Sequence, residues 1–307
     1  MVIQVRPFNW KNDYYLIQQF LIETFHMSKD YENWLPTRFE NRKVGPCGSE
    51  YREEEDDLVT IWEEIIESGS KIVAVVILEN DSFYTINIHP EYKSLEKEII
   101  LWIESKFQNE IKSSIEKKLH IFAYGTDKDR ITTLKKLDYT DQGFDEYDRK
   151  FSLNNGIANY TLPQGYSIKH VDTKRDFLKY RDVMGAVFPH CKKMTERTFK
   201  VFTKASFYHP ELDIISVAPD GSFAAFCTIR LDPIGKIAEL EPVGTHPNHR
   251  RLGLGKAVIL EGLKRLEKFE PKAICIPGAA ANEAANRLYD SLGFTDKTEV
   301  HLWQKEL

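Results

Sequence analysis

Cysteine is scarce in this sequence and never paired. The 307 residues hold four cysteines, all far apart: Cys47, Cys191, Cys227 and Cys275. Without a Cys-x-x-Cys pair they provide neither the ligand spacing of a zinc site nor the framework of a disulfide-rich secreted domain. The sequence therefore predicts no metal, no disulfide framework and a reducing, cytoplasmic environment.

Long apolar runs are missing as well. The longest, Ile72 to Leu78, is much shorter than the roughly 20 residues that cross a bilayer. The N-terminal stretch from Met1 to Phe20 carries Arg6, Lys11 and Asp13, where a secretory signal has an unbroken apolar segment. We therefore expect no membrane partner.

Positive charge is not in excess, because the formal net charge is -5. A surface that neutralises many phosphates would be an exception on this acidic background, so no nucleic-acid partner is expected. Hydrophobic residues make up 42% and charged residues 29%, which is typical of globular proteins. The length suits two domains of about 150 residues each.

Both halves of the chain begin with the same pattern. An alternating stretch, Val2 to Arg6 or Tyr166 to His170, predicts a strand and is followed by apolar residues at helical spacing. A segment rich in turn formers, Leu153 to Gly165, separates the halves. The predicted fold class is α/β with mixed sheets, in domains covering 1–155 and 160–307.

Short matches between the halves indicate a duplication. The residues from Ile88 to Tyr92 match those from Thr245 to His249, and Leu137 to Asp141 match Leu292 to Asp296. The two offsets are nearly equal, as expected when one structural unit occurs twice.

The stretch from Ile237 to Phe294 carries the chemical signals. Its first strand alternates, with Glu239 and Glu241 on one face, until Pro242 and Gly244 interrupt it. Because proline donates no ladder hydrogen bond and glycine weakens a strand, this pair predicts a bulge or a parting of neighbouring strands.

A basic, glycine-containing loop follows and leads into a helix. Glycines at a helix start let backbone N–H groups approach a ligand, and the helix dipole favours an anion such as pyrophosphate. Two common phosphate motifs fail here, because Val258 replaces the third glycine of the dinucleotide fingerprint and Ala257 replaces the Ser/Thr of a triphosphate loop. The loop residues are Arg250, Arg251, Leu252, Gly253, Leu254, Gly255 and Lys256.

The pattern Arg250-x-x-Gly253-x-Gly255 resembles the signature of the GNAT superfamily of N-acetyltransferases. The run from Asn282 to Phe294, with Tyr289 and a terminal Gly-Phe, resembles the family's second motif. The resemblance covers residues 160–307 and extends more faintly to the first half. It implies tandem GNAT-like domains, each a twisted mixed sheet flanked by helices, with the N-terminal copy degenerate.

The same resemblance implies acetyl-coenzyme A as co-substrate, lying in a V-shaped gap between two central parallel strands. Val243, Gly244 and Thr245 would lie along the pantetheine arm, the loop from Arg250 to Lys256 would bind the pyrophosphate, and Asn282 would reach the pantetheine. No metal is required. The expected acceptor is a primary amine of a small molecule, and the expected assembly is a monomer or homodimer.

Acetyl transfer to an amine needs a base, an oxyanion donor and an acid. Glu239 stands eleven residues before Arg250, which resembles the position of the glutamate base in histone-type members of the family, so it ranks first, with Glu241 close behind. The backbone N–H of Val243 is the candidate oxyanion donor, because Pro242 has none. Tyr289 is the candidate acid for the leaving thiolate.

Each of these residues also has an ordinary structural interpretation. A strand glutamate is usually a solvated edge residue, and Asn282 before a helix suits an N-cap. Tyr289 at helical spacing with leucines suits packing. His246 and His249 flank a proline without acidic or cysteine neighbours, which favours loop residues over metal ligands.

The first half lacks the loop chemistry. Lys93, Glu96 and Glu98 stand where Arg250, Gly253 and Gly255 stand in the second half, and Leu134 replaces Tyr289. Carboxylates at this point repel a pyrophosphate, so this half is expected not to bind coenzyme A and to serve a structural or substrate-shaping role. Two other functions remain open: a non-catalytic acyl-coenzyme A sensor, and a partner-binding module. The identity of the acceptor is not encoded in these motifs.

Overall fold

The computed structural model describes residues 2–25, 27–28, 30–45, 47, 55–67, 69–80, 82–110, 117–153, 156–280 and 282–307. The chain forms two compact units that do not follow its two halves. Unit 1 comprises Met1–Pro36, Arg52–Asp148 and Thr298–Leu307, and unit 2 comprises Thr37–Tyr51 and Arg149–Lys297. Part of the predicted linker, Asn154 and Asn155, lies outside the described residues.

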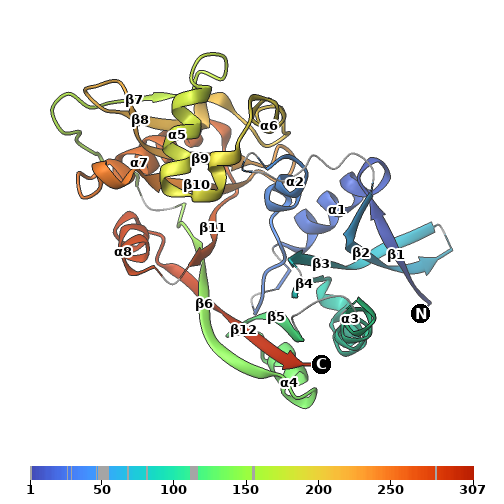
Figure 1. Ribbon diagram of the computed structural model, residues 1–307. Coiled ribbons are helices and arrows are strands. Elements are labelled where there is room, and N and C mark those ends of the chain that lie inside the picture. Colours follow the sequence, from blue (N-terminus) through green and yellow to red (C-terminus); the bar gives the residue numbers. More distant parts are fainter. Residues whose placement is uncertain are drawn as a thin grey trace. The chain divides into compact units, whose positions relative to one another are not determined.

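Unit 1 is a mixed sheet flanked by helices (Figure 1). Its strands run in the order β1-β2-β3-β4-β5-β12-β6, and β4 pairs with β5 in parallel. The strands are β1 (Ile3–Asn9), β2 (Glu55–Ile66), β3 (Gly69–Asn80), β4 (Phe83–Ile88), β5 (Lys118–Tyr124), most of β6 (Thr140–Lys150) and most of β12 (Asp296–Glu306). The helices are α1 (Trp10–Thr24), the 3-10 helix η1 (Pro90–Leu95), α3 (Glu96–Glu110) and α4 (Lys128–Lys136).

Unit 2 repeats this plan, with strands in the order β11-β10-β9-β8-β7. Here β10 and β11 are parallel, and the other pairs are antiparallel. The strands are β7 (Ser167–His170), β8 (Asp213–Val217), β9 (Phe223–Leu231), β10 (Ile237–Thr245) and β11 (Ala273–Ala280). The helices are α2 (Pro36–Val44), α5 (Phe177–Val187), α6 (Glu196–Phe202), α7 (Leu254–Leu266) and α8 (Glu283–Leu292), with 3-10 helices η3 (Pro189–Lys193), η4 (Pro210–Leu212), η5 (Pro247–His249) and η6 (Glu267–Phe269).

The described elements of the two halves follow the same order along the chain, which confirms the predicted repeat of a mixed α/β fold. β1 to β6 correspond in turn to β7 to β12, and α1 to α4 correspond to α5 to α8. The functional roles predicted for 1–155 and 160–307 remain predictions. The compact units do not follow these bounds, because each unit includes a segment from the other half of the chain. The last strand of the second half pairs with β5 of unit 1, and Thr37–Tyr51 of the first half lies in unit 2.

The sheet of unit 2 is covered on both faces. Ile229 contributes to the face under α7, where it lies close to Gly262. Phe226, three residues away, packs in a cluster with Tyr180 of α5. Because strand residues an odd number apart point to opposite faces, α5 and α7 cover opposite sides of the sheet. The central strand β9 is therefore buried between helices along its whole length.

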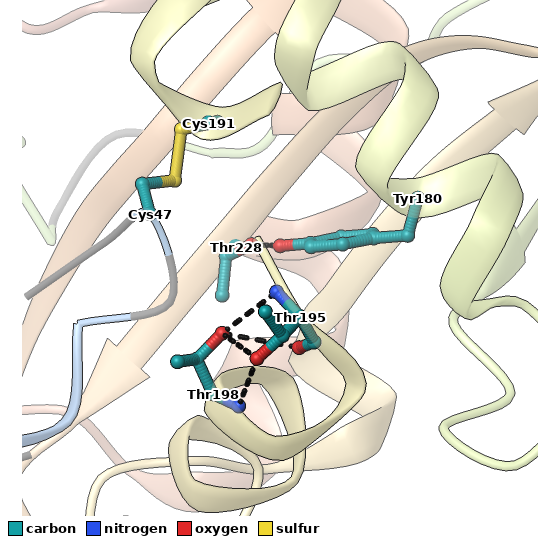
Figure 2. The surroundings of a disulfide bond; sticks show 6 residues. All are labelled: Cys47, Tyr180, Cys191, Thr195, Thr198 and Thr228. Carbon is teal, nitrogen blue, oxygen red and sulfur yellow. Dashed lines mark hydrogen bonds between the residues drawn. A yellow bond between two sulfur atoms is a disulfide. The ribbon is translucent and has the colours of Figure 1, made fainter. Parts of the chain in front are cut away.

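A disulfide corrects the expectation drawn from the isolated cysteines. Cys47 and Cys191 are bonded within unit 2, 144 positions apart (Figure 2). Cys227 and Cys275 are buried free thiols. Sequence spacing carries no signal for a pair at such separation, because the two residues meet only when the fold brings them together.

Among the described residues, no helix is both long and apolar enough to cross a membrane.

Candidate acyl-coenzyme A site in unit 2

The two central parallel strands of unit 2 separate part-way along their length. Backbone pairing between β10 and β11 runs from Ile237 opposite Ala273 to Glu239 opposite Cys275. Both strands continue well beyond this point, to Thr245 and Ala280. The sequence predicted such a gap from Pro242 and Gly244. A strand without its neighbour leaves backbone N–H and C=O groups free for an extended ligand.

Beyond the separation, β10 exposes one edge. Its register against β9 shifts between Leu240 and Val243, at the cis Glu241–Pro242 bond. The N–H of His246 donates to Ala224 of β9 at 2.9 Å. Because backbone groups along a strand alternate between its two edges, Val243 and Thr245 direct theirs away from β9, toward the gap. These are the two residues that the resemblance assigns to the pantetheine arm.

Gly244 is required by packing in this segment. A Cβ atom at this position would lie 2.5 Å from a ring carbon of Phe226 and 2.8 Å from a methyl carbon of Val187. Such contacts are far shorter than van der Waals separation, so any side chain here would push β10 from its course.

The N-terminus of α7 forms a backbone nest. Arg251 and Gly253 have left-handed backbones with φ of 63° and 74°. No side chain caps Gly253, and no acidic residue lies in the first turn. The first N–H groups of a helix have no intrahelical partner, so those of Leu254, Gly255 and Lys256 are available to an anion. A left-handed non-glycine residue is a strained feature that clusters at functional sites.

The side chains of the loop divide between binding and anchoring. Arg250, Arg251 and Leu252 are exposed, and the Nε of Arg250 donates to the carbonyl of Thr245 at 3.4 Å. Leu254 is 1% exposed and fixes the start of α7 to the core. Every loop residue named from the sequence thus lies between the end of β10 and the first turn of α7.

Glu239 is buried, and one of its carboxylate oxygens makes two contacts. Its side chain accepts a hydrogen bond of 2.6 Å from the hydroxyl of Thr37, and the same oxygen lies 3.5 Å from Arg230. Arg230 stands directly opposite Glu239 on β9, and the two residues are 4% and 1% exposed. A carboxylate held in this way is well positioned but poorly accessible to an incoming amine.

Glu241 differs from Glu239 in both exposure and charge environment. Its side chain is accessible to solvent. The protein around it displaces part of its water and so raises the pKa of its carboxyl, and the nearby Glu239 raises it further. The positive charges of Arg230 and Arg38 oppose these effects. A raised pKa makes a carboxylate a stronger base.

Tyr289 lies in the C-terminal half of α8 and is 9% exposed. Burial raises the pKa of its hydroxyl, and the negative charge of the Glu241 carboxylate raises this pKa further. The hydroxyl therefore stays protonated at neutral pH. Gly293, with φ of 95°, ends α8, which explains the Gly-Phe end of the motif.

Asn282 acts as the N-cap of α8. Its side-chain oxygen accepts hydrogen bonds from Ala284 N–H at 3.1 Å and from Ala285 N–H at 3.2 Å. The structural interpretation of this residue is therefore confirmed, and its contact with pantetheine remains a prediction.

Arg149 was not identified from the sequence. Its fully buried guanidinium donates to Asp290 at 2.6 Å, to the Phe294 carbonyl at 2.8 Å and to Asn286 at 2.8 Å. It also lies 5.9 Å from the ring centre of Tyr289. Arg149 thus fixes both ends of the α8 turn that carries Tyr289. A lone arginine at the end of a strand carries no sequence signal for such a role.

Comparison with known families fits this geometry. The model described as "Acetyltransferase (GNAT) family" matches residues 180–294, which include the separated strand, the nest and α8. Residues 180–294 thus match the GNAT family. The resemblance drawn from the two motifs is confirmed.

Part of the chain also matches curated relatives. A mycothiol acetyltransferase from Paenarthrobacter aurescens (strain TC1) is 28% identical over 153 residues, which cover 48% of this chain and 47% of the relative. Another, from Thermobispora bispora, is 44% identical over 61 residues, covering 20% and 21%. The chain therefore matches about half the length or less of these curated relatives.

Similarity in fold covers nearly the whole chain. A GCN5-related N-acetyltransferase from Sphaerobacter thermophilus has a TM-score of 0.68 at 16% identity and covers 99% of this chain and 95% of its own. A tandem GNAT protein from the clavulanic acid biosynthesis pathway has a TM-score of 0.66 at 12% identity, covering 99% and 98%. The tandem GNAT fold predicted from the sequence is confirmed.

The GNAT fold of unit 1 has a gap at the same place, and an arginine fills it. Pairing between β4 and β5 covers only Phe83 with His120 and Tyr84 with Ile121. Arg130 of α4 donates to the carbonyl of Ile86 at 3.1 Å on β4, and to that of Phe122 at 3.3 Å on β5. The duplication places Ala285 at the matching position of unit 2, and an alanine side chain cannot donate such hydrogen bonds.

The start of α3 in unit 1 already carries its own anion. The Glu96 carboxylate accepts from Lys93 at 2.8 Å and from Arg130 at 2.7 Å, and Asp127 accepts from Lys93 at 2.7 Å. These groups are largely buried. The four charges satisfy one another where unit 2 offers free donors. This supports the expectation that the first half does not bind coenzyme A.

Proposed function

We propose that unit 2 binds acetyl-coenzyme A and transfers its acetyl group to the primary amine of a small molecule. One observation carries this proposal: β10 parts from β11 beyond Glu239, and its open edge leads to the uncapped, left-handed nest at the start of α7. A pantetheine arm can pair with such an edge while a pyrophosphate accepts from the nest.

The residues of the site suit the two groups of the co-substrate. Gly253 has no atom within 4 Å of its Cβ position, so the space above the nest is open. Arg250, Arg251 and Lys256 supply positive charge around it, and no acidic side chain lies in the first turn of α7. Val243 and Thr245 supply the edge.

Within this proposal, Glu241 is the base and Glu239 is a positioning carboxylate. This reverses the order suggested by the sequence, because Glu239 is buried against Thr37 and Arg230 whereas Glu241 is accessible and has a raised pKa. Glu241 takes the proton of the attacking amine, directly or through water. The N–H of Val243 donates to the developing oxyanion, and the protonated Tyr289 donates to the leaving sulfur.

A panel assay tests the proposal. Purified protein is mixed with acetyl-coenzyme A and a range of amines, and release of the free thiol is followed. The curated relatives bear the name mycothiol acetyltransferase, so the panel should include the amine that such an enzyme acetylates. Turnover with any amine supports the proposal. Binding of acetyl-coenzyme A without turnover favours a sensor, and calorimetry that detects no binding at millimolar concentration refutes both.

A further inference from the structure

A segment of the first half is built into unit 2. Within it, Glu40 accepts from the backbone N–H and the hydroxyl of Ser206, at 2.8 and 2.6 Å. Val44 packs in a buried cluster with Phe202, Phe207 and Tyr208. We call residues Thr37 to Val44, together with Cys47, the inserted segment.

The inserted segment supplies groups to the catalytic strand of the proposed site. Thr37 is 1% exposed and its hydroxyl donates to Glu239. The positive charge of Arg38 lowers the pKa of Glu241, against the other groups that raise it. Displacement of the segment would therefore remove a donor from one carboxylate and a cation from the field of the other.

The disulfide joins this segment to a rigid part of unit 2. Cys191 is 1% exposed in η3, between α5 and α6. Thr195 and Thr198 form a reciprocal capping box at the start of α6, and Tyr180 on α5 contacts Thr228 on β9 at 3.4 Å (Figure 2). The Cys191 side of the bond is thus fixed to the framework, and the Cys47 side holds the inserted segment.

The bond is open to exchange chemistry. Cys47 is only partly buried, whereas Cys191 is buried. The exposed His190 has a ring nitrogen that lies with the two sulfurs, all within 4.8 Å of one another. A neighbouring imidazolium stabilises a thiolate, which makes a cysteine a better leaving group in thiol–disulfide exchange.

We propose that the Cys47–Cys191 disulfide is a reversible redox site that fastens the inserted segment, and with it Thr37, against the catalytic strand. A small dithiol or two monothiols act as reductant. The first thiolate attacks the sulfur of Cys47, the less buried of the two cysteines, and Cys191 leaves as a thiolate beside His190. A second thiolate then attacks the reductant sulfur of the mixed disulfide, which frees Cys47 as a thiol and releases the oxidised reductant. Oxidation by a disulfide reverses these steps.

The functional consequence rests on the acetyl transfer proposed above, but the structural consequence does not. Reduction releases the covalent anchor and leaves the Glu40 and Val44 contacts to hold the segment alone. Local opening of the segment then becomes more frequent, and Thr37 spends less time at Glu239.

The test compares oxidised protein with protein reduced by dithiothreitol. Peptide mapping after alkylation counts the disulfide, hydrogen exchange follows the backbone of residues 39–44, and kinetics give kcat and KM for the amine. We expect reduction to speed exchange of these amides, to lower kcat/KM for the amine by about fivefold, and to leave acetyl-coenzyme A affinity unchanged.

Two variants complete the design. Cys47→Ser should behave as the reduced protein and no longer respond to dithiothreitol. Thr37→Val should keep the faster exchange on reduction but lose the change in kcat/KM, because the group that transmits it is gone. A merely stabilising disulfide would show no such separation between exchange and rate.

The result that overturns the redox site is plain. Free thiols at both positions after treatment with oxidised glutathione, or zinc retained by them in the purified protein, would refute the disulfide. Exchange over residues 39–44 that is identical in both redox states would refute the fastening. If no amine is ever turned over, the proposed function fails, and the exchange measurement still decides this proposal.

Discussion

The hydroxyl of Thr37 donates a hydrogen bond of 2.6 Å to the carboxylate of Glu239, which lies 202 positions further along the chain. A residue of the first half thus sets the environment of a strand in the second. The bond occupies Glu239, whereas Glu241 is accessible to solvent, and the proposed function gives the two glutamates different roles. The first prediction concerns this difference.

Glu241→Gln should lower kcat/KM for the amine by about 10²- to 10⁴-fold, the usual range for loss of a general base. Glu239→Gln is the matched control, and we expect a loss nearer tenfold, because it removes only the ion-pair contact with Arg230. Initial rates at saturating acetyl-coenzyme A measure both. A larger loss for Glu239→Gln than for Glu241→Gln would return the base to Glu239.

The pH profile gives an independent check on the same group. The pKa of Glu241 is raised, so its carboxyl holds a proton at higher pH than an ordinary glutamate. A base works only when deprotonated, so activity should fall as the pH drops through this raised value, above the ordinary 4.5. That acidic limb should be missing from the residual activity of Glu241→Gln.

Tyr289→Phe should reduce kcat by about 10²-fold and leave the affinity for acetyl-coenzyme A within a factor of about three. The ring and its packing against Phe294 remain, and only the hydroxyl is lost. Stopped-flow thiol release and calorimetry report the two quantities. An unchanged kcat would mean that water, not Tyr289, protonates the leaving sulfur.

Much of the backbone geometry of this candidate site was predictable from sequence because its signals are local. Pro242 and Gly244 interrupt a strand, Gly253 and Gly255 open a helix, and Gly293 ends another, each by its own backbone preference. The partners that set the chemistry were not predictable. Thr37 and Arg149 reach their targets from distant parts of the chain, and no local pattern distinguishes them from any other threonine or arginine.

The cysteines show the same limit in a sharper form. Their scatter argued against a disulfide, yet Cys47 and Cys191 meet because the inserted segment crosses into unit 2. The role of Arg130, in contrast, could have been predicted from the sequence. Aligning the two halves sets it against Ala285, and a large cation in place of a small residue beside a predicted gap is a signal that the gap is filled.

The arginine in unit 1 suggests a transfer experiment. Ala285→Arg should place a guanidinium in the gap of unit 2 and weaken acetyl-coenzyme A binding by at least about 100-fold, since it occupies the backbone edge that the pantetheine needs. Ala285→Ser is the control, because it changes the residue but keeps the side chain small, and it should bind normally. Calorimetry measures affinity, and thermal unfolding verifies that both variants fold. Normal binding by Ala285→Arg would place the pantetheine elsewhere.

Two variants test the nest at the start of α7, because they differ in charge but share the same backbone strain. Gly253 has φ of 74°, so any side chain there costs about 1 kcal/mol of stability or more. Gly253→Glu and Gly253→Gln share this strain and similar size. We expect the carboxylate to weaken acetyl-coenzyme A binding at least about tenfold more than the amide does, because it competes for the same N–H groups. Equal losses would indicate that shape alone matters.

Asp213 provides the last prediction, on stability. It is fully buried and accepts from Tyr208 at 2.9 Å and from Thr228 at 2.7 Å, and burial raises its pKa from 3.8 to about 7. The folded state therefore binds a proton that the unfolded state has released, and the free energy of unfolding falls as pH rises between these values, by up to about 1.4 kcal/mol per unit. Asp213→Asn cannot ionise, so it should gain stability relative to wild type on going from pH 5 to 7, whatever its offset at pH 5. Urea unfolding at both pH values measures the difference, with the exposed Asp182→Asn as control. A constant difference across this range would show that Asp213 is ionised throughout.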